Sequence, residues 1–417
     1  MKKLLWTGLM LIMAWAVCSC GKVKENTETA TPTVTAIAEV SETVSGAAVT
    51  ATPIPSDEAF ALADEMIANM TLEQKIGQMF LVDLYQLDKR RTKSGMVQSV
   101  TKNMGKSIYR HNVGGVYLME GNLVSTKQTK KLMEDLQASA VTGGSLYIAV
   151  EEDGGGEHSI SAKVSQLNDT GYITPQEMGR DMTGEQVYEA GKTIGMELEK
   201  VGVNLNLAPV ADVGSEKNEP YAMRCLGTEA ESVADLLERY VKGMREGGVA
   251  VTLKHFPGIG NVPGDCSEEI FENTDSLMTL RNNNFITYSS GIQAGADCVM
   301  MSNVSLTEII TDKIPAFMSA DIVTNLLRKE LKFDGVVMTS PLNDNIIRDT
   351  YSVKEVVLQS VNAGCDMLVL PLDFQESYQT LLEAVKSGTI EEKRINTSVR
   401  RILQNKIQRG IIKIDNN

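Results

Sequence analysis

Short apolar segments alternate with longer amphipathic segments along the chain from about residue 57 onward. Each apolar segment has the length of a strand, and each amphipathic segment has the length and period of a helix. This alternation is typical of βα units around a parallel sheet, whose strands are buried on both faces. Eight segments are predicted as strands: residues 78–82, 113–118, 146–150, 204–208, 250–254, 297–301, 335–338 and 366–370.

The segments between these strands carry helix patterns and helix boundary signals. Thr71 and Gln74 form a capping-box pattern, and Gly202 and Gly364 stand where helices are expected to stop. Because eight parallel strands can close on themselves, we expect a single α/β domain, a (β/α)8 barrel of the TIM type, over residues 57–417. The predicted helices cover residues 127–140, 184–201, 230–246, 276–294, 320–331, 353–363, 377–386 and 390–409.

The start of the chain has the features of an export signal. Lys2 and Lys3 precede an apolar run that is too short to span a bilayer. The pattern Val17-Cys-Ser-Cys20 resembles a bacterial lipobox, so residues 1–19 are predicted as a lipoprotein signal peptide and Cys20 as the lipid attachment site. An ordinary signal peptide that is cut nearby is the alternative.

Residues 20–56 are rich in Thr, Ala, Val, Ser and Glu and contain no aromatic residue that could nucleate a core. We therefore predict a disordered tether between the lipid and the barrel. The protein is expected outside the cytoplasm, and its only contact with the bacterial cell membrane is expected through the lipid anchor.

Charge and cysteine usage exclude several classes of function. The formal net charge is −14, so nucleic acid is not an expected partner. Cys225, Cys266, Cys298 and Cys365 are scattered over the predicted barrel without CxxC spacing, and the whole chain has three histidines. No disulfide framework, no metal site and no cofactor is therefore predicted.

Polar residues follow the predicted strands at their carboxyl ends. In a closed barrel of this kind, the residues just beyond these ends line one shared mouth. Solvated loop ends would explain some of these residues one at a time, but not all of them together. A ligand site is therefore predicted at the mouth, among Glu151, Glu152, Asp153, Asp212, His255, Ser302, Asn303, Thr339 and Ser340.

Several short motifs, in order from about residue 61 to residue 410, resemble glycoside hydrolase family 3 and specifically its single-domain β-N-acetylglucosaminidases. Lys254-His-Phe-Pro-Gly258, directly after a predicted strand, is the most specific of them. The resemblance implies retaining hydrolysis of β-linked N-acetylglucosamine through a covalent glycosyl-enzyme intermediate. The other matching motifs are Met70-Thr-Leu-Glu-Gln-Lys-Ile-Gly-Gln-Met79, Gly114-Gly-Val-Tyr-Leu118, Asp153-Gly-Gly155, Asn206-Leu-Ala-Pro-Val-Ala-Asp212, Arg224-Cys-Leu-Gly227, Phe333-Asp-Gly-Val-Val337 and Ala363-Gly-Cys-Asp366.

The same resemblance shows departures at both catalytic positions. The relatives' nucleophile is the first Asp of a Ser-Asp-Asp-Leu motif after the seventh strand, and here Ser340, followed by Pro341, stands in its place. The relatives' proton donor is a His, and Ser267 occupies that position. A serine hydroxyl lacks both the charge and the nucleophilicity of a carboxylate, so ordinary turnover should be lost.

Sugar-binding positions are kept in part. Two arginines of the relatives' third-strand loop become Gly156 and Ser159, and Ile259 and Asn303 stand where the relatives have histidines. The remaining substrate-binding set, which the resemblance implies for an amino-sugar or cell-wall glycan, is Glu151, Asp212, Arg224, Lys254 and His255.

Two residues of this set have more than one possible partner or role. Lys254 closes a buried strand and needs a nearby acid or a ligand to compensate its charge, with Asp212 and Glu151 as candidates. His255 is expected to hydrogen-bond a sugar hydroxyl, to orient the turn at Phe256-Pro257, or to do both.

Three functions remain open on these grounds. The first is a catalytically impaired family member that still binds N-acetylglucosamine-containing glycans. The second is an active retaining glycosidase with relocated carboxylates, for which Asp344, Glu268 and Glu269 are available. Asp344 is expected rather to cap the helix after Pro341, and the two glutamates to be solvated loop charges. The third is a surface scaffold that binds a protein and no sugar.

Overall fold

The computed structural model describes residues 55–88, 97–140, 145–155, 173–215, 219–259, 262, 264 and 266–414. The predicted signal peptide, Cys20 and nearly all of the predicted tether lie outside the described residues, as do Gly156 and Ser159. Within the described chain, no helix combines the length and the apolar character that a membrane span requires.

Eight parallel strands form the centre of the molecule, and each lies within or overlaps a predicted segment. Neighbours in the chain are neighbours in the sheet from β1 to β7, and β8 pairs with β1. A bridge between Met338 and Met367 links β7 to the start of β8 and closes the ring, which confirms the (β/α)8 barrel. The strands are β1 Phe80–Val82, β2 Gly115–Tyr117, β3 Tyr147–Val150, β4 Leu205–Asn206, β5 Ala250–Phe256, β6 Cys298–Met301, β7 Val336–Met338 and β8 Leu368–Val369.

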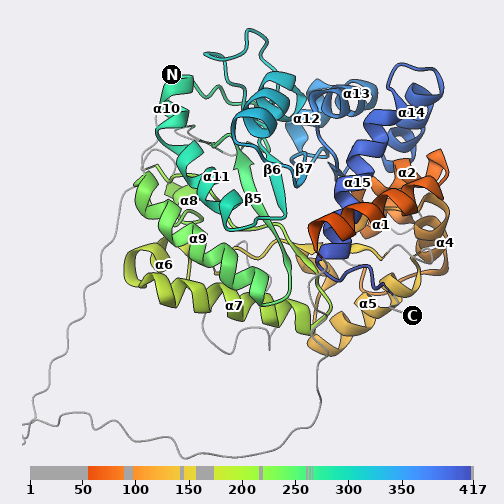
Figure 1. The fold of residues 1–417 in the computed structure, drawn as a ribbon, viewed down its shortest axis with the longest axis horizontal. Coiled ribbons are helices and arrows are strands. Elements are labelled where there is room, and N and C mark those ends of the chain that lie inside the picture. Colours follow the sequence, from red (N-terminus) through yellow and green to blue (C-terminus); the bar gives the residue numbers. More distant parts are fainter. Residues whose placement is uncertain are drawn as a thin grey trace, which may run out of the picture. The chain divides into compact units, whose positions relative to one another are not determined.

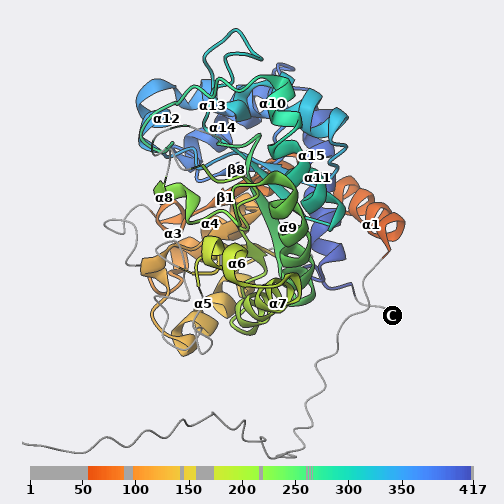
Figure 2. The same ribbon diagram turned by 90° about the vertical axis from the view of Figure 1, so that its left-hand side faces the viewer.

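The helices surround this barrel (Figures 1 and 2). Most predicted helices are present within a few residues of their expected bounds. Two short 3-10 turns, η1 Glu120–Asn122 and η3 Ala316–Met318, and a π-type helix, η4 Asp321–Glu330, accompany them. The α-helices are α1 Ser56–Ala68, α2 Leu72–Gln78, α3 Leu84–Leu87, α4 Lys102–His111, α5 Thr126–Ala138, α6 Pro175–Asp181, α7 Gly184–Lys200, α8 Glu219–Ala222, α9 Ala230–Glu246, α10 Leu277–Arg281, α11 Asn284–Gln293, α12 Asn345–Thr350, α13 Val353–Ala363, α14 Phe374–Lys386 and α15 Glu392–Gln408.

The single helix predicted over residues 276–294 is wrong, because the structure divides it into α10 and α11. Asn283 has a non-helical backbone (φ −132°, ψ −98°) between the two helices. The side chain of Asn284 is buried and accepts a hydrogen bond from the backbone of Val213, 3.1 Å away. Asparagine side chains compete with helical hydrogen bonding, and here a tertiary partner decides the competition.

The C-terminal helix α15 covers the amino-terminal end of the barrel. The Lys406 ammonium, which is fully buried, donates to the Gln78 side chain (2.9 Å) and to the carbonyl of Gly114 (2.8 Å), just before β1 and β2. The neighbouring Asn405 bonds Tyr147 at the start of β3, at 2.6 Å. These contacts place α15 against the starts of β1, β2 and β3, at the opposite end of the barrel from the residues predicted to line its mouth.

Candidate active site

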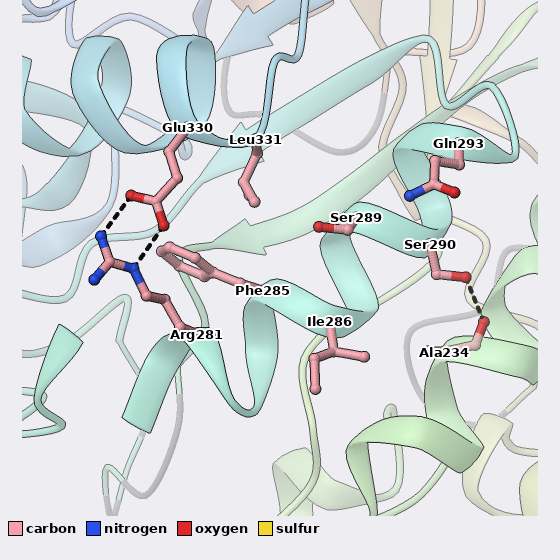
Figure 3. Close-up of a pocket in the computed structure, with 9 residues that line it drawn as sticks. All are labelled: Ala234, Arg281, Phe285, Ile286, Ser289, Ser290, Gln293, Glu330 and Leu331. Atoms are coloured by element: carbon pink, nitrogen blue, oxygen red, sulfur yellow. Dashed lines mark hydrogen bonds and ion pairs between the residues drawn. The ribbon is translucent and has the colours of Figure 1, made fainter. Parts of the chain in front are cut away.

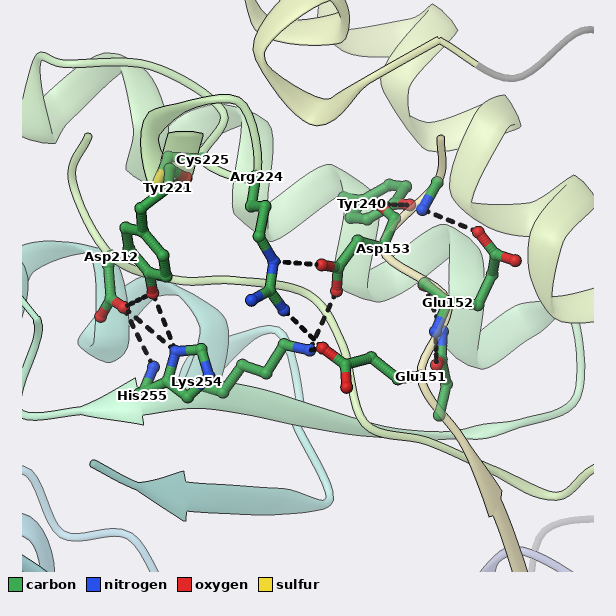
Figure 4. Close-up of polar contacts among 12 residues, drawn as sticks. Glu151, Glu152, Asp153, Asp212, Tyr221, Arg224, Cys225, Tyr240, Lys254 and His255 are labelled. Atoms are coloured by element: carbon green, nitrogen blue, oxygen red, sulfur yellow. Dashed lines mark hydrogen bonds and ion pairs between the residues drawn. The ribbon is translucent and has the colours of Figure 1, made fainter. Parts of the chain in front are cut away.

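Four charged side chains meet at the carboxyl ends of β3 and β5 (Figure 4). The Lys254 ammonium lies 2.6 Å from a Glu151 oxygen and 3.0 Å from an Asp153 oxygen. The Arg224 guanidinium, from the loop after α8, contacts the same two acids, with its Nε 2.7 Å from Asp153. The cluster therefore joins two cations and two carboxylates from three separate segments of the chain.

Burial makes this pairing obligatory. The side chains of Lys254 and Asp153 are 2% and 1% exposed, and a charge at such depth is costly unless an opposite charge neutralises it. Glu151 is a partner of Lys254, as predicted. Asp212 is not, and the second acid is Asp153, because the loop after β3 turns back toward β5 and brings that carboxylate to the ammonium.

The electrostatics hold Glu151 ionised. Burial disfavours its charged form, but the nearby charges of Lys254 and Arg224 outweigh burial and hold the pKa of Glu151 well below its ordinary value. The Tyr117 hydroxyl donates a further hydrogen bond to Glu151 at 3.0 Å. For Arg224 burial opposes the charge, yet Asp153 and Glu151 raise the pKa of its guanidinium above its ordinary value. Glu151 and Arg224 are thus both charged at neutral pH.

Asp212 forms a second buried group beside the first. Its carboxylate accepts hydrogen bonds from the hydroxyls of Tyr221 and Tyr288, the latter at 3.0 Å. The backbone N–H of His255 donates to the same carboxylate at 3.2 Å. Asp212 therefore organises tyrosines and His255 rather than compensating Lys254.

His255 lies inside β5, which runs two residues further than predicted, to Phe256. Its Nδ1 is 2.8 Å from the Tyr221 hydroxyl and 3.5 Å from the Asp212 carboxylate. Burial, together with the cations of Lys254 and Arg224, lowers the pKa of His255 against the opposing effect of Asp212. The ring is therefore held neutral and hydrogen-bonds Tyr221, while the carbonyl of His255 accepts from the backbone N–H of Gly258 at 2.8 Å, across the turn at Phe256-Pro257.

Ser340 belongs to a third group at the mouth, built from the ends of β6 and β7. Its hydroxyl donates to the side-chain oxygen of Asn303. The Asn303 amide in turn donates to the Asp344 carboxylate at 2.8 Å and to the carbonyl of Cys266 at 3.2 Å. Asp344 does stand at the start of α12, but its side chain makes no capping hydrogen bond, so the predicted cap is wrong. The Asp344 carboxylate accepts its hydrogen bond from Asn303 instead of from the helix backbone.

The loop that carries Ser267 packs on the start of the same helix. The carbonyl of Ser267 accepts a hydrogen bond from the backbone of Ile346 at 3.2 Å. The exposed Glu268 carboxylate accepts from the Asn345 side chain at 2.9 and 3.1 Å. Glu268 and Asp344, far apart in sequence, are thus both tied to the start of α12, whereas Glu269 is exposed to solvent.

The sequence placed Asp153 among the mouth residues but did not predict that it pairs with Lys254 and Arg224. Tyr221 is the residue of this site that the sequence analysis missed. Tyr221 carried no signal, because only the folded path between β4 and α9 brings its hydroxyl between Asp212 and His255.

The described residues contain no group of three His, Cys, Asp or Glu side chains arranged to hold a metal ion. Cys225, Cys298 and Cys365 are free thiols.

A separate cavity of about 480 Å³ is lined by residues of α9, α10, α11 and η4 and the residue after η4, and by none of the mouth residues (Figure 3). The Arg281–Glu330 ion pair, at 2.6 Å, borders it, and Phe285, Ile286 and Leu331 supply apolar lining. Large apolar side chains that are strongly exposed in the described chain, such as Tyr109, Met196 and Met278, lie on different helices. This scatter does not favour the protein-binding scaffold, for which a continuous apolar patch would be the sign.

Comparison with known proteins gives the same family that the motifs indicated. The family described as the glycosyl hydrolase family 3 N terminal domain matches residues 71–405. A β-hexosaminidase of Xylella fastidiosa (strain M23) is 30% identical over 263 residues, which cover 62% of this chain and 76% of that protein. β-Hexosaminidase A of Pseudoalteromonas piscicida is 25% identical over 365 residues, which cover 80% of this chain and 60% of that protein.

Solved structures agree. A family 3 β-N-acetylglucosaminidase of Paenibacillus sp. str. FPU-7 superposes with a TM-score of 0.73 at 31% identity, covering 82% of this chain and 63% of that one. A β-N-acetylhexosaminidase of Beutenbergia cavernae DSM 12333 gives 0.69 at 28% identity, covering 80% and 98%. This chain thus spans less than two thirds of the Pseudoalteromonas and Paenibacillus proteins.

Proposed function

Because this chain belongs to glycoside hydrolase family 3 through its N-terminal barrel domain, we propose that its mouth binds a β-linked N-acetylglucosamine-containing glycan with little or no hydrolysis. The similar proteins of Paenibacillus and Beutenbergia are described as acting on N-acetylated amino sugars. These similar proteins support the class of sugar, and Ser340 and Ser267 of this chain support the loss of hydrolysis.

The ionic cluster of Glu151, Asp153, Arg224 and Lys254 supports binding. The four side chains hold one another in place through their ion pairs. A ligand hydroxyl therefore meets donors and acceptors that are already ordered, and binding loses little side-chain entropy. Glu151 and Arg224 keep side-chain exposures of 29% and 16%, which leaves them accessible to a ligand.

The single observation that carries the loss of turnover is the environment of Ser340. Its hydroxyl donates to the amide oxygen of Asn303, which is not a base and cannot take the proton. A retaining mechanism needs a carboxylate at about 5 Å from the acid group to form the glycosyl-enzyme bond. An un-ionised hydroxyl supplies neither this nucleophile nor the negative charge that stabilises the transition state.

Isothermal titration calorimetry tests the binding. We expect heat with N-acetylglucosamine or with muropeptide-like oligosaccharides, and at least about tenfold weaker binding for Arg224→Gln, which loses a charged hydrogen-bond donor. Arg239→Gln is the matched control, because Arg239 is exposed on α9 and pairs only weakly with Asp235 at 3.4 Å. No heat at millimolar ligand would remove the proposal.

Release of nitrophenol from an aryl β-N-acetylglucosaminide tests the loss of turnover. The protein is expected to match the no-enzyme rate. Restoring both lost groups, with Ser340→Asp and Ser267→His together, is expected to produce a measurable rate, whereas Ser340→Asp alone should yield much less because the proton donor is still missing.

The second candidate, an active glycosidase with relocated carboxylates, rests on the hydrogen bond from Asn303 to Asp344. This contact places the Asp344 carboxylate beside Asn303, to which Ser340 is hydrogen-bonded. Glu268 accepts a hydrogen bond from Asn345 at the start of α12. Activity in the aryl assay that is lost on Asp344→Asn or Glu268→Gln would establish it. Asp349→Asn, an exposed change on α12, should leave such activity intact.

We also propose, on sequence grounds, that the protein is held at the bacterial cell surface by a lipid on Cys20. Labelling with a fatty-acid probe and fractionation of the membranes test this. Cys20→Ser should abolish both the label and the membrane association, whereas Cys18→Ser should preserve them. Label retained on Cys20→Ser would contradict the anchor.

A further inference from the structure

We infer that Tyr221 sets the tautomer of His255, so that the ring carries its proton on Nδ1 and presents a bare Nε2 to the ligand. Tyr221 is then a positioning residue for the sugar contact. The ligand contact rests on the proposed function, but the tautomer itself does not, because it is a property of the ligand-free protein.

The row Asp212–Tyr221–His255 determines where the tyrosine and imidazole protons lie. The Tyr221 hydroxyl lies in hydrogen-bond contact with the Asp212 carboxylate on one side and 2.8 Å from His255 Nδ1 on the other. Asp212 is fully buried and also accepts from Tyr288 and from the backbone N–H of His255. The Asp212 oxygens thus act as acceptors in each of these contacts.

The tyrosine has one proton for two neighbours. If it donated that proton to His255, its own oxygen would face the Asp212 carboxylate with no hydrogen between two close acceptors. If it donates to Asp212, its oxygen lone pair is open to a proton from Nδ1, and every close contact is satisfied. Burial raises the pKa of Tyr221 well above its ordinary value, so the proton stays on the hydroxyl.

The second ring nitrogen is therefore an acceptor. His255 is held neutral by burial and by the adjacent cations of Lys254 and Arg224, as described above, which disfavours a second proton on Nε2. The His255 side chain is 16% exposed, and no described residue hydrogen-bonds Nε2.

This fixes the chemistry of the ligand group that lies against His255. A bare imidazole nitrogen accepts from a hydroxyl or an amide N–H and repels the lone pairs of a carboxylate or phosphate. The ligand must therefore present a donor at this point, as an unmodified sugar hydroxyl does.

Nitrogen NMR of protein labelled with ¹⁵N-histidine tests the tautomer without any ligand. The chain has only three histidines, so His255→Gln identifies the His255 signals. We expect Nδ1 to resonate as a protonated nitrogen and Nε2 as a bare one. A protonated Nε2 in the unaltered protein would overturn the inference, whatever the variants do.

Two tyrosine variants test whether the Tyr221 hydroxyl sets the tautomer or whether the tyrosine ring only packs beside His255. In Tyr221→Phe, the Nδ1 proton loses its acceptor at 2.8 Å, and the Asp212 carboxylate lies further away, at 3.5 Å. The preference for a proton on Nδ1 should therefore weaken, and part of the proton population should move to Nε2. Tyr288→Phe also removes a hydroxyl from Asp212 but does not touch the His255 ring, so its Nε2 should stay bare. An unchanged His255 spectrum in folded Tyr221→Phe would overturn the inference.

Adding N-acetylglucosamine at millimolar concentration tests the ligand contact. The Nε2 signal should move while Nδ1 stays in place. If calorimetry shows binding and Nε2 does not move, the contact is wrong. If neither method detects the sugar while the ligand-free spectrum is as expected, the proposed function fails and the tautomer assignment stands.

Discussion

At the scale of single residues, buried charges decide how the mouth is built. Lys254 is compensated by two carboxylates, and Arg224 links the same pair from a loop. Removing one member leaves an unpaired charge at low exposure, which costs more than the net contribution of the pair. The cluster should therefore be sensitive to any single neutral substitution.

Lys254→Met is expected to lower the free energy of unfolding by about 3 kcal/mol, because Asp153 would remain buried with Arg224 as its only described cation. Denaturant unfolding measures this. Lys242→Met, which breaks an exposed pair with Glu238, should cost less than about 1 kcal/mol. Equal effects of the two substitutions would contradict the structural role of the cluster.

Lys406 gives a pH prediction at the other end of the barrel. Burial lowers the pKa of its ammonium from 10.5 to about 7, so between these values the unfolded chain binds more protons than the folded one. The free energy of unfolding should therefore rise with pH from about 7 toward 10.5, at up to about 1.4 kcal/mol per pH unit.

Lys406→Met isolates this contribution, since the variant retains the other titrating groups. The stability of the unaltered protein relative to the variant should increase with pH across that window in denaturant titrations. Parallel stability curves for the two proteins would show that Lys406 does not titrate there.

At the scale of elements, the packing of α7 against α9 depends on glycine. These helices lie side by side in both views of the fold (Figures 1 and 2). A Cβ on Gly243 would come 2.0 Å from the carbonyl oxygen of Tyr188, and one on Gly191 would come 2.5 Å from that of Tyr240. Only glycine permits this approach, and Tyr240 in turn hydrogen-bonds the Asp153 carbonyl at 3.1 Å.

Gly243→Ala is expected to destabilise the protein by about 1–3 kcal/mol, because the helices must separate to admit the methyl group. Thermal and denaturant unfolding measure the loss. Gly105→Ala in α4 is the control: its new methyl group would meet the Ser139 side chain, with the hydroxyl at 3.1 Å and Cβ at 3.7 Å, rather than backbone, and alanine is the better helix former. A neutral Gly243→Ala would mean that the two helices adjust freely.

At the scale of the whole molecule, the C-terminal helix completes the barrel. Besides its bonds near β1, β2 and β3, α15 places Arg401 and Ser398 on the buried Asp366 before β8. Asp366 is ionised, because Arg328, Arg401 and Arg394 lower its pKa against the effect of burial. One helix thus satisfies buried polar groups from several strands that are distant in sequence.

Ending the chain before Ile390 should abolish cooperative unfolding, because those polar groups would be left without partners. Circular dichroism during denaturation would show a broad, weak transition. Lys393→Ala, an exposed change on α15, should keep the sharp transition. A cooperative barrel without α15 would contradict this role of the helix.

Hydrophobic patterns along the chain were enough to predict the eight strands, most helices and the pairing of Glu151 with Lys254 at one end of the barrel. These follow from local burial patterns and from one rule, that parallel strands finish at the same end of a barrel. The sequence could not determine which second acid pairs with Lys254, that Asn284 breaks a helix, or that Asp344 bonds Asn303 instead of capping α12.

Those points depend on the folded chain, because each is set by where a loop turns relative to strands far away in the sequence. The sequence predicted Asp212 and Glu151 for Lys254, and the path of the β3 loop selected Asp153 in place of Asp212. Tyr221 shows the same limit: the chemistry of its hydroxyl depends on two neighbours that meet it only after the barrel has closed.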